Sequence, residues 1–209
     1  MRNPLIITIG REYGSGGREI GELVAKTLGI AYYDKKLITL AAQKSGLSDE
    51  FIANNEQRVR SGFMQNLAAS AAYSSGFFSS QYLPLSESIF ISEAQVIRDI
   101  AAKESAVIVG RCADFALRDF DHVLHVFIRA DLEIRIARCM QIFSLSADKA
   151  KKLIHKTDKI RADYYNRYSG QTWGDISNNH LIIDAGTLGI DLSAELICKT
   201  IKDLEARVK

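Results

Sequence analysis

The chain has 209 residues, of which 47% are hydrophobic, and its formal net charge at pH 7 is +2. Such a chain can bury one full core, with or without a small insert. The near-neutral charge gives no reason to expect a nucleic-acid partner, and no run of about 18 apolar residues indicates a membrane span. The cysteines Cys112, Cys139 and Cys198 form no CxxC pair, so we expect buried free thiols in a reducing cytoplasm.

The N-terminal segment carries the most informative motif. An apolar run at residues 5–9 predicts a strand, and a glycine-rich segment follows it directly. An amphipathic helical pattern comes next and ends at Gly29. Strand, glycine loop and helix in this order form the arrangement in which backbone N–H groups cradle phosphate at a helix N-terminus. The loop residues predicted to bind the phosphates of ATP are Gly14, Ser15, Gly16 and Gly17.

The centre of this loop departs from the usual signature, GxxxxGK[ST]. Gly17 and Arg18 stand where Lys and Ser or Thr are expected. A positive side chain at the start of a helix opposes the helix dipole, and a bound anion would offset that penalty. Arg18 is therefore the predicted ATP-binding and catalytic substitute for Lys. Glu19 lies where a Mg²⁺-binding hydroxyl often sits, so it is predicted either to hold the metal of ATP or to be an ordinary first-turn residue.

Further strands and helices alternate along the rest of the chain. Short apolar runs predict five strands that are covered on both faces. They lie at residues 5–9, 30–33, 106–109, 123–128 and 181–183. Helices are expected at residues 20–28, at 35–44 behind an Asp34 cap, at 89–100, after an Asp131 cap, and after Asp191. This alternation predicts an α/β fold with a doubly wound parallel sheet.

Two segments interrupt this alternation. Residues 61–85 contain no charged side chain and are rich in Ser, Ala, Gly and aromatic residues. They are interpreted as an apolar-lined insert that covers a substrate, or as a disordered loop. Residues 146–168 form one or two basic helices, which are either a solvated face or a lid that carries Arg161 three residues after Asp158. The tyrosines that follow Arg161 are expected to pack.

Charged residues after two of the strands are further site candidates. Arg111 and Asp114 follow the third strand, and open α/β sheets bind ligands at the carboxyl ends of their strands. Arg111 is predicted to bind substrate, with Asp114 orienting it or accepting a hydrogen bond from a base or sugar. A surface ion pair is the alternative.

Three arginines accompany the fourth strand and the helix after it, namely Arg129, Arg135 and Arg138. Arg135 and Arg138 are spaced to share one helix face, which is expected to lie opposite an apolar stripe. Arginines there suit a transferring phosphoryl group, and a solvated basic face is the alternative. After the fifth strand, residues 184–189 are interpreted as a loop that contacts a purine or as a simple turn. The four histidines show no metal-binding spacing and are expected to be structural.

Together these motifs resemble the nucleoside monophosphate kinases, and most closely the cytidylate kinase-like family. The resemblance rests on five segments of the sequence. They are the opening ITIGREYGSGGREIG, Tyr-Tyr-Asp34, Val-Gly-Arg-Cys-Ala-Asp114, the pair Arg135 and Arg138, and Asp158-x-x-Arg161. The resemblance implies one P-loop kinase-like domain over residues 1–209, a three-layer sandwich with a five-stranded parallel sheet. It also implies a helical monophosphate-binding insert at about residues 35–85 and a lid at about residues 144–165.

The resemblance further implies transfer of the ATP γ-phosphate to CMP or dCMP with Mg²⁺, in the cytoplasm. Arg135, Arg138 and Arg161 would surround the transferred group, and Asp34, Arg111 and Asp114 would hold the acceptor. In cytidylate kinases the Asp directly follows the Arg, whereas Asp114 lies three residues after Arg111. Two alternatives stay open. One is a kinase of another small molecule on the same fold, and the other is a nucleotide-binding regulatory protein without turnover, which the missing Lys favours.

Overall fold

The computed structural model describes residues 4–34 and 85–207, and the chain divides into two compact units. The first unit comprises residues 1–34 and 97–209 and carries the whole described sheet. The second comprises residues 35–96, of which residues 85–96, the first part of helix α4 (Leu85–Lys103), are described. The predicted insert and the predicted helix at 35–44 therefore lie outside the described residues, apart from Leu85, where α4 begins.

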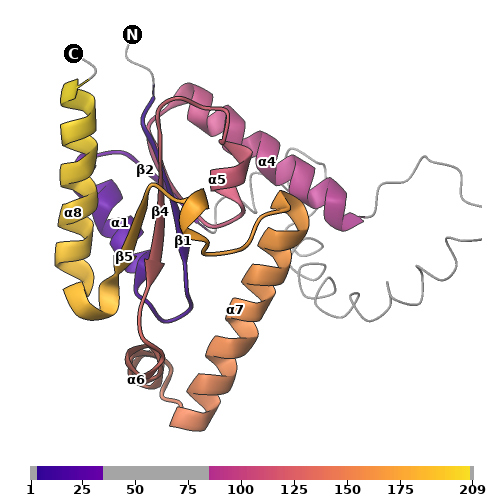
Figure 1. Ribbon diagram of the computed structural model, residues 1–209, viewed down its shortest axis with the longest axis vertical. Coiled ribbons are helices and arrows are strands. Elements are labelled where there is room, and N and C mark those ends of the chain that lie inside the picture. The colour runs from indigo at the N-terminus through magenta and orange to yellow at the C-terminus, as the bar shows by residue number, and fades with distance from the viewer. Residues whose placement is uncertain (1–3, 35–84, 208–209) are drawn as a thin grey trace, which may run out of the picture. The chain divides into compact units, whose positions relative to one another are not determined.

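The sheet has five parallel strands in the order β2-β3-β1-β4-β5 (Figure 1). Their bounds are β1 (Ile6–Arg11), β2 (Ala31–Tyr33), β3 (Ala106–Val109), β4 (Val123–Arg129) and β5 (Leu181–Asp184). All five predicted strands are confirmed within two residues at either end. Most residues in the three central strands are buried, which explains their continuous apolar runs.

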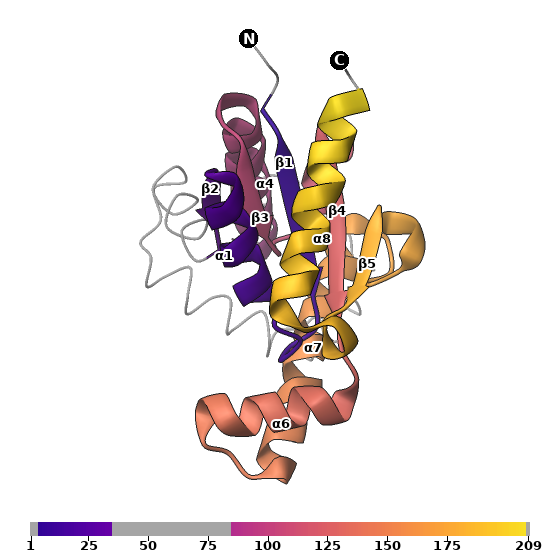
Figure 2. The same ribbon diagram turned by 90° about the vertical axis from the view of Figure 1, so that its left-hand side faces the viewer.

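Helices cover both faces of the sheet and make a three-layer fold. α1 (Gly17–Leu28) and α8 (Ala185–Arg207) lie together on one face, where their apolar side chains join those of the strands in one core (Figure 2). The part of α4 from Ile97 onward and the short helix α5 (Ala113–Ala116) lie on the other face (Figure 1). The predicted α/β class is confirmed.

α6 (Leu132–Phe143) and α7 (Ala147–Ser169) form a helical hairpin beyond the carboxyl edge of the sheet (Figure 2). The predicted basic segment is thus a single helix. The two helices share a small apolar cluster of buried residues, Ile136, Cys139, Ala150 and Ile154, and Tyr13 of the glycine loop packs on it. The short 3₁₀ helix η2 (Ile176–Asn178) precedes β5.

The start of α8 includes the segment that follows the fifth strand. Residues 184–189 were interpreted as a loop that contacts a purine or as a simple turn, and residues 185–188 form a helical turn that breaks at Gly189 (φ 75°, ψ 176°). Asp184 stabilises this turn by accepting hydrogen bonds from the backbone N–H groups of Gly186 and Thr187 at 3.0 and 3.3 Å. None of the helices in residues 4–34 and 85–207 is long and apolar enough to cross a membrane.

Candidate phosphate-binding site

The glycine loop connects β1 to α1 at the carboxyl edge of the sheet. Gly14 and Gly16 have positive φ angles of 81° and 86°, which residues with a Cβ rarely adopt. The Ser15 hydroxyl donates a hydrogen bond to the Glu12 carbonyl at 2.9 Å and closes the turn. Gly16 is the N-cap residue of α1 and has no side chain with which to cap the first turn. The helix therefore presents its N-terminal dipole at the loop, as an anion site requires.

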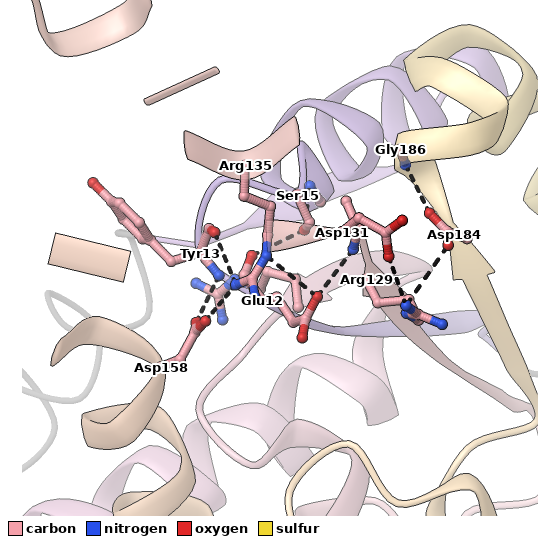
Figure 3. Close-up of polar contacts among 12 residues, drawn as sticks. Glu12, Tyr13, Ser15, Arg129, Asp131, Arg135, Asp158, Asp184 and Gly186 are labelled. Atoms are coloured by element: carbon pink, nitrogen blue, oxygen red, sulfur yellow. Dashed lines mark hydrogen bonds and ion pairs between the residues drawn. The ribbon is translucent and has the colours of Figure 1, made fainter. Parts of the chain in front are cut away.

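Glu12 fastens the loop to the start of α6. One of its carboxylate oxygens, Oε2, accepts a hydrogen bond from the Ala130 N–H at 2.9 Å and lies 3.6 Å from Nε of Arg135 (Figure 3). The Glu12 N–H in turn donates to the Ile128 carbonyl of β4 at 3.0 Å. These contacts fix the first half of the loop against β4 and the start of α6.

Asp158 of α7 fastens the loop from the other side. Its Oδ1 accepts a hydrogen bond from the Tyr13 N–H at 2.7 Å, and its Oδ2 accepts one from Nη1 of Arg135 at 2.5 Å (Figure 3). Nη1 of Arg161 lies 4.0 Å from the same carboxylate. One side chain thus links the loop, α6 and α7, which makes the hairpin part of the site.

Arg135 and Arg138 lie beside the loop, but not as the sequence predicted. Arg135 is only 8% exposed, and its backbone carbonyl and Cβ lie against Gly14, as does Sγ of Cys139. The predicted face opposite the apolar stripe is therefore wrong for Arg135, because residues 135 and 139 are four apart and share the buried side of α6. Arg138 forms an ion pair with Glu19 at the first turn of α1.

Arg18 points away from the middle of the loop. Its side chain is 67% exposed, and its Nε lies 3.1 Å from Glu22 and 3.4 Å from Asp34. These two carboxylates raise the pKa of Arg18, with Asp34 as the larger influence. The structure thus places Arg18 beside the end of β2, next to the predicted substrate residue Asp34.

A second group of positive charges meets at the ends of β1 and β3. Nη1 of Arg161 donates a hydrogen bond to the Arg11 carbonyl at 2.9 Å, and Asp34 lies 4.0 Å from the Arg11 guanidinium. Burial, together with the charges of Arg161 and Arg111, lowers the pKa of Arg11 to about 9. Burial also lowers the pKa of Arg161. Sequence reasoning singled out Arg111, Arg161 and Asp34 but missed Arg11.

The backbone after β3 is unusual at three successive residues. Gly110, Arg111 and Cys112 all have positive φ angles, of 81°, 59° and 51°. Two of these residues carry a Cβ, so the turn stores strain of a kind that clusters at functional sites. The turn faces the Arg11 guanidinium, because a Cβ on Gly110 would lie 3.1 Å from Cζ of Arg11.

Asp114 lies behind this turn and contacts α7. Its carboxylate accepts a hydrogen bond from the Tyr165 hydroxyl at 2.5 Å, so it fastens the far end of α7 to α5. Burial raises the pKa of Asp114 despite this hydrogen bond. Tyr165, which the sequence indicated as a packing residue, is therefore also a polar link.

The loop fits the phosphates of a nucleotide better than the neighbouring carboxylates fit a metal. The two positive-φ glycines and the N-terminus of α1 form a phosphate cradle. Glu19, the predicted metal ligand, is paired with Arg138. Across the described parts of the chain, no group of three or more His, Cys, Asp or Glu side chains is placed to hold a metal ion. A Mg²⁺ ion would therefore depend mainly on phosphate oxygens and water.

Comparisons with known proteins agree with this geometry. The model of the cytidylate kinase-like family matches residues 6–187. An uncharacterized protein from Eubacterium ventriosum, whose crystal structure is known, is 27% identical with a TM-score of 0.70, and the match covers 95% of this chain and 98% of that one. No curated protein sequence matches the chain.

Two kinases of known structure share the fold at lower identity. A gluconokinase from Sinorhizobium meliloti 1021 has a TM-score of 0.53 at 11% identity, with 100% of both chains covered. A shikimate kinase from Bacteroides thetaiotaomicron has a TM-score of 0.52 at 14% identity, with 95% of this chain and 98% of that chain covered. The fold is thus that of the P-loop kinases.

Proposed function

The chain belongs to the cytidylate kinase-like family, and from this premise we propose that it transfers the γ-phosphoryl group of ATP to a small anionic acceptor, first among them CMP or dCMP. One observation carries this proposal. The glycine loop, a phosphate cradle, is bordered by arginines from several separate segments, and little other than positioning and charge is needed for phosphoryl transfer. Those arginines are Arg11, Arg135, Arg138 and Arg161, whereas Arg18 turns to Glu22 and Asp34.

On the donor side, Gly14 to Gly17 would hold the ATP phosphates through backbone N–H groups. Arg138 borders the same loop, since a Cβ on Gly16 would lie 3.7 Å from its Cζ. Arg135 and Arg161 are held at the site by Asp158. A bound Mg²⁺ would neutralise phosphate charge, with Glu19 able to take part if Arg138 turns to the phosphates.

On the acceptor side, Asp34 and Arg111 are the proposed substrate residues, at the ends of β2 and β3. Asp114 supports the acceptor side from behind through Tyr165. The α6–α7 hairpin, including the proposed lid at about residues 144–165, would close over the phosphates. We place this reaction in the cytoplasm, with nucleotides rather than nucleic acids or membranes as partners.

A kinase of a different acceptor is the second candidate. The charges around Arg11 suit a carboxylate as well as a phosphate monoester. The shikimate kinase and gluconokinase that share this fold are named for non-nucleotide acceptors. A regulatory protein that binds nucleotide without turnover is the third, because Gly17 leaves the loop without its usual Lys.

An acceptor panel separates these candidates. Purified protein is incubated with ATP and Mg²⁺ plus CMP, dCMP, UMP, AMP, GMP, shikimate or gluconate, and ADP is followed with an acceptor-free control. ADP formation with CMP or dCMP supports the first candidate, and ADP formation with a non-nucleotide acceptor alone supports the second. Saturable ATP binding without acceptor-dependent ADP would leave only the regulatory candidate.

A further inference from the structure

The space beside Gly17 is filled by the side chain of another residue. Gly17 opens α1 at the position where the usual loop signature has Lys. A Cβ built on Gly17 would lie 2.6 Å from Cβ of Arg11 and 3.1 Å from its Cγ. Cβ atoms essentially never lie less than 3.0 Å from another heavy atom, so a side chain at position 17 would displace the stem of Arg11.

The other end of the same side chain lies over a second glycine. A Cβ on Gly110 would lie 3.1 Å from Cζ of Arg11 and closer still to Nη1. β1 and β3 are neighbours, and the pairing of Ile9 with Val109 brings Arg11 and Gly110 to the same edge of the sheet. Two glycines from distant parts of the sequence thus make room for one arginine, which runs from the first turn of α1 to the end of β3.

Positive charge is concentrated where this guanidinium ends. Arg161 and Arg111 are close enough to lower its pKa, as described above. Asp34, the carboxylate that pairs with Arg11 among the described residues, is 4.0 Å away and lies nearer to Arg18, at 3.4 Å. The Arg11 side chain is largely buried, lies near like charges and shares its counter-ion Asp34 with Arg18, so a bound anion would offset the repulsion.

We propose that Arg11 replaces the missing P-loop Lys and binds a phosphate group at the glycine loop, together with Arg161. This inference rests on the proposed function, and it moves the charge role from Arg18 to Arg11. A guanidinium offers a planar pair of N–H donors that can bind two phosphate oxygens at once. Arg161 connects the α6–α7 hairpin to this site, because its Nη1 donates a hydrogen bond to the Arg11 carbonyl.

Binding of inorganic pyrophosphate tests the site without requiring turnover. The wild type is compared with Arg11→Met, with Arg18→Met and with Arg118→Met, a control at an exposed arginine that pairs with Asp119. Arg11→Met should weaken pyrophosphate binding about ten- to a hundredfold, as expected for loss of a charged hydrogen-bonding pair. Arg18→Met and Arg118→Met should change it by less than about threefold. Unchanged binding in Arg11→Met, or an equal loss in Arg18→Met, would overturn the inference.

Moving the positive side chain from position 11 to position 17 tests directly whether the two positions share one space. Gly17→Lys alone should lower the melting temperature and pyrophosphate affinity, because the new side chain collides with Arg11. Gly17→Lys combined with Arg11→Gly should regain both, because glycine also removes the Arg11 Cβ, with which the new side chain collides at 2.6 Å. If the double variant binds no better than Arg11→Gly, or if Gly17→Lys alone behaves as wild type, the two side chains do not share one space and the proposal fails.

The outcome is separable from that of the acceptor panel. If Arg11→Met loses pyrophosphate binding and the wild type turns over no acceptor, the anion site is supported and both enzyme candidates are excluded. Turnover that survives in Arg11→Met at the wild-type rate would support the enzyme and remove the role of Arg11.

Discussion

His125 and His180 stack at the β4–β5 side of the sheet, with ring centroids 4.8 Å apart. Nδ1 of His125 is 2.8 Å from the Thr8 hydroxyl, and Nδ1 of His180 accepts a hydrogen bond from the His125 N–H at 3.1 Å. The sequence predicted structural histidines, and these contacts agree with that role. Burial, and secondarily the neighbouring His180, lowers the pKa of His125 from 6.5 to about 4.

This shift predicts a pH dependence of stability. Below pH 6.5 the unfolded chain takes up a proton at His125 while the folded chain stays neutral until about pH 4. Stability is therefore lost as the pH falls through this window, by about 3 kcal/mol in the limit, and this residue contributes no slope above it. Urea unfolding between pH 4 and 7.5 should show a flatter profile for His125→Gln than for wild type. The exposed His155→Gln variant is the control, and a wild-type slope in His125→Gln would refute this account.

The second prediction at the residue scale concerns the stability that the Asp158 carboxylate provides. Asp158→Ala removes acceptors from Tyr13 N–H and Arg135, so we expect a loss of about 3 kcal/mol in the free energy of unfolding. Exchange of the Tyr13 amide hydrogen should also become faster. Asp163→Ala on the same helix breaks an exposed ion pair with Lys159 and should cost less than about 0.5 kcal/mol. Equal losses in the two variants would show that Asp158 is an ordinary surface residue.

At the scale of elements, the turn after β3 connects backbone strain with the arginine of β1. Gly110→Ala places a methyl group against the Arg11 guanidinium at a φ of +81°. Gly29→Ala is a matched control, because its φ is +65° and nothing lies within 4 Å of the added Cβ. The control should lose about 1–2 kcal/mol from strain alone.

We expect Gly110→Ala to lose more stability than Gly29→Ala and to weaken pyrophosphate binding, which the control leaves intact. In an Arg11→Ala background the additional loss should shrink, because the colliding group is gone. Thermal unfolding of Gly110→Ala and Gly29→Ala, each with and without Arg11→Ala, measures this difference in stability loss. An additional loss that persists without Arg11 would place the cause elsewhere in the turn.

The sequence predicted the strands and helices better than it predicted which side chains contact one another. Strands that are buried on both faces are recognisable in a sequence as short apolar runs, and the structure contains all five predicted strands. The single helix α7 and the helical turn at 185–188 were less certain, because basic and glycine-rich segments fit several structures. Arg135 was placed on the wrong face because Gly14 covers the side of α6 that a pattern alone assigns to solvent.

At the scale of the whole molecule, Arg11 shows that strand order cannot be read from a local sequence pattern. Arg18 follows the position of the missing Lys and was chosen for that reason. Arg11 precedes that position by six residues, and its guanidinium meets Gly110 because β1 lies beside β3. A signal was present in the sequence, since an arginine that ends a buried central strand needs a partner at the sheet edge. Its meaning depended on the strand order, which no local pattern contains.

The same strand order brings the charges together. β1 is central, and the segments that follow β1, β2, β3 and β4 contribute to one edge, while α7 reaches that edge through Asp158 and Arg161. Fold, loop and charge therefore point to phosphoryl transfer, even though the loop lacks its usual lysine.

The most direct measurement is ³¹P nuclear magnetic resonance of the protein with ATP, Mg²⁺ and CMP. We predict that the ATP γ-phosphate signal declines while the β-phosphate signal of CDP appears. The rate should fall about a hundredfold or more in Arg11→Met and stay within a few-fold of wild type in Arg18→Met. ATP that binds but stays intact with CMP and with every other acceptor of the panel would contradict the account.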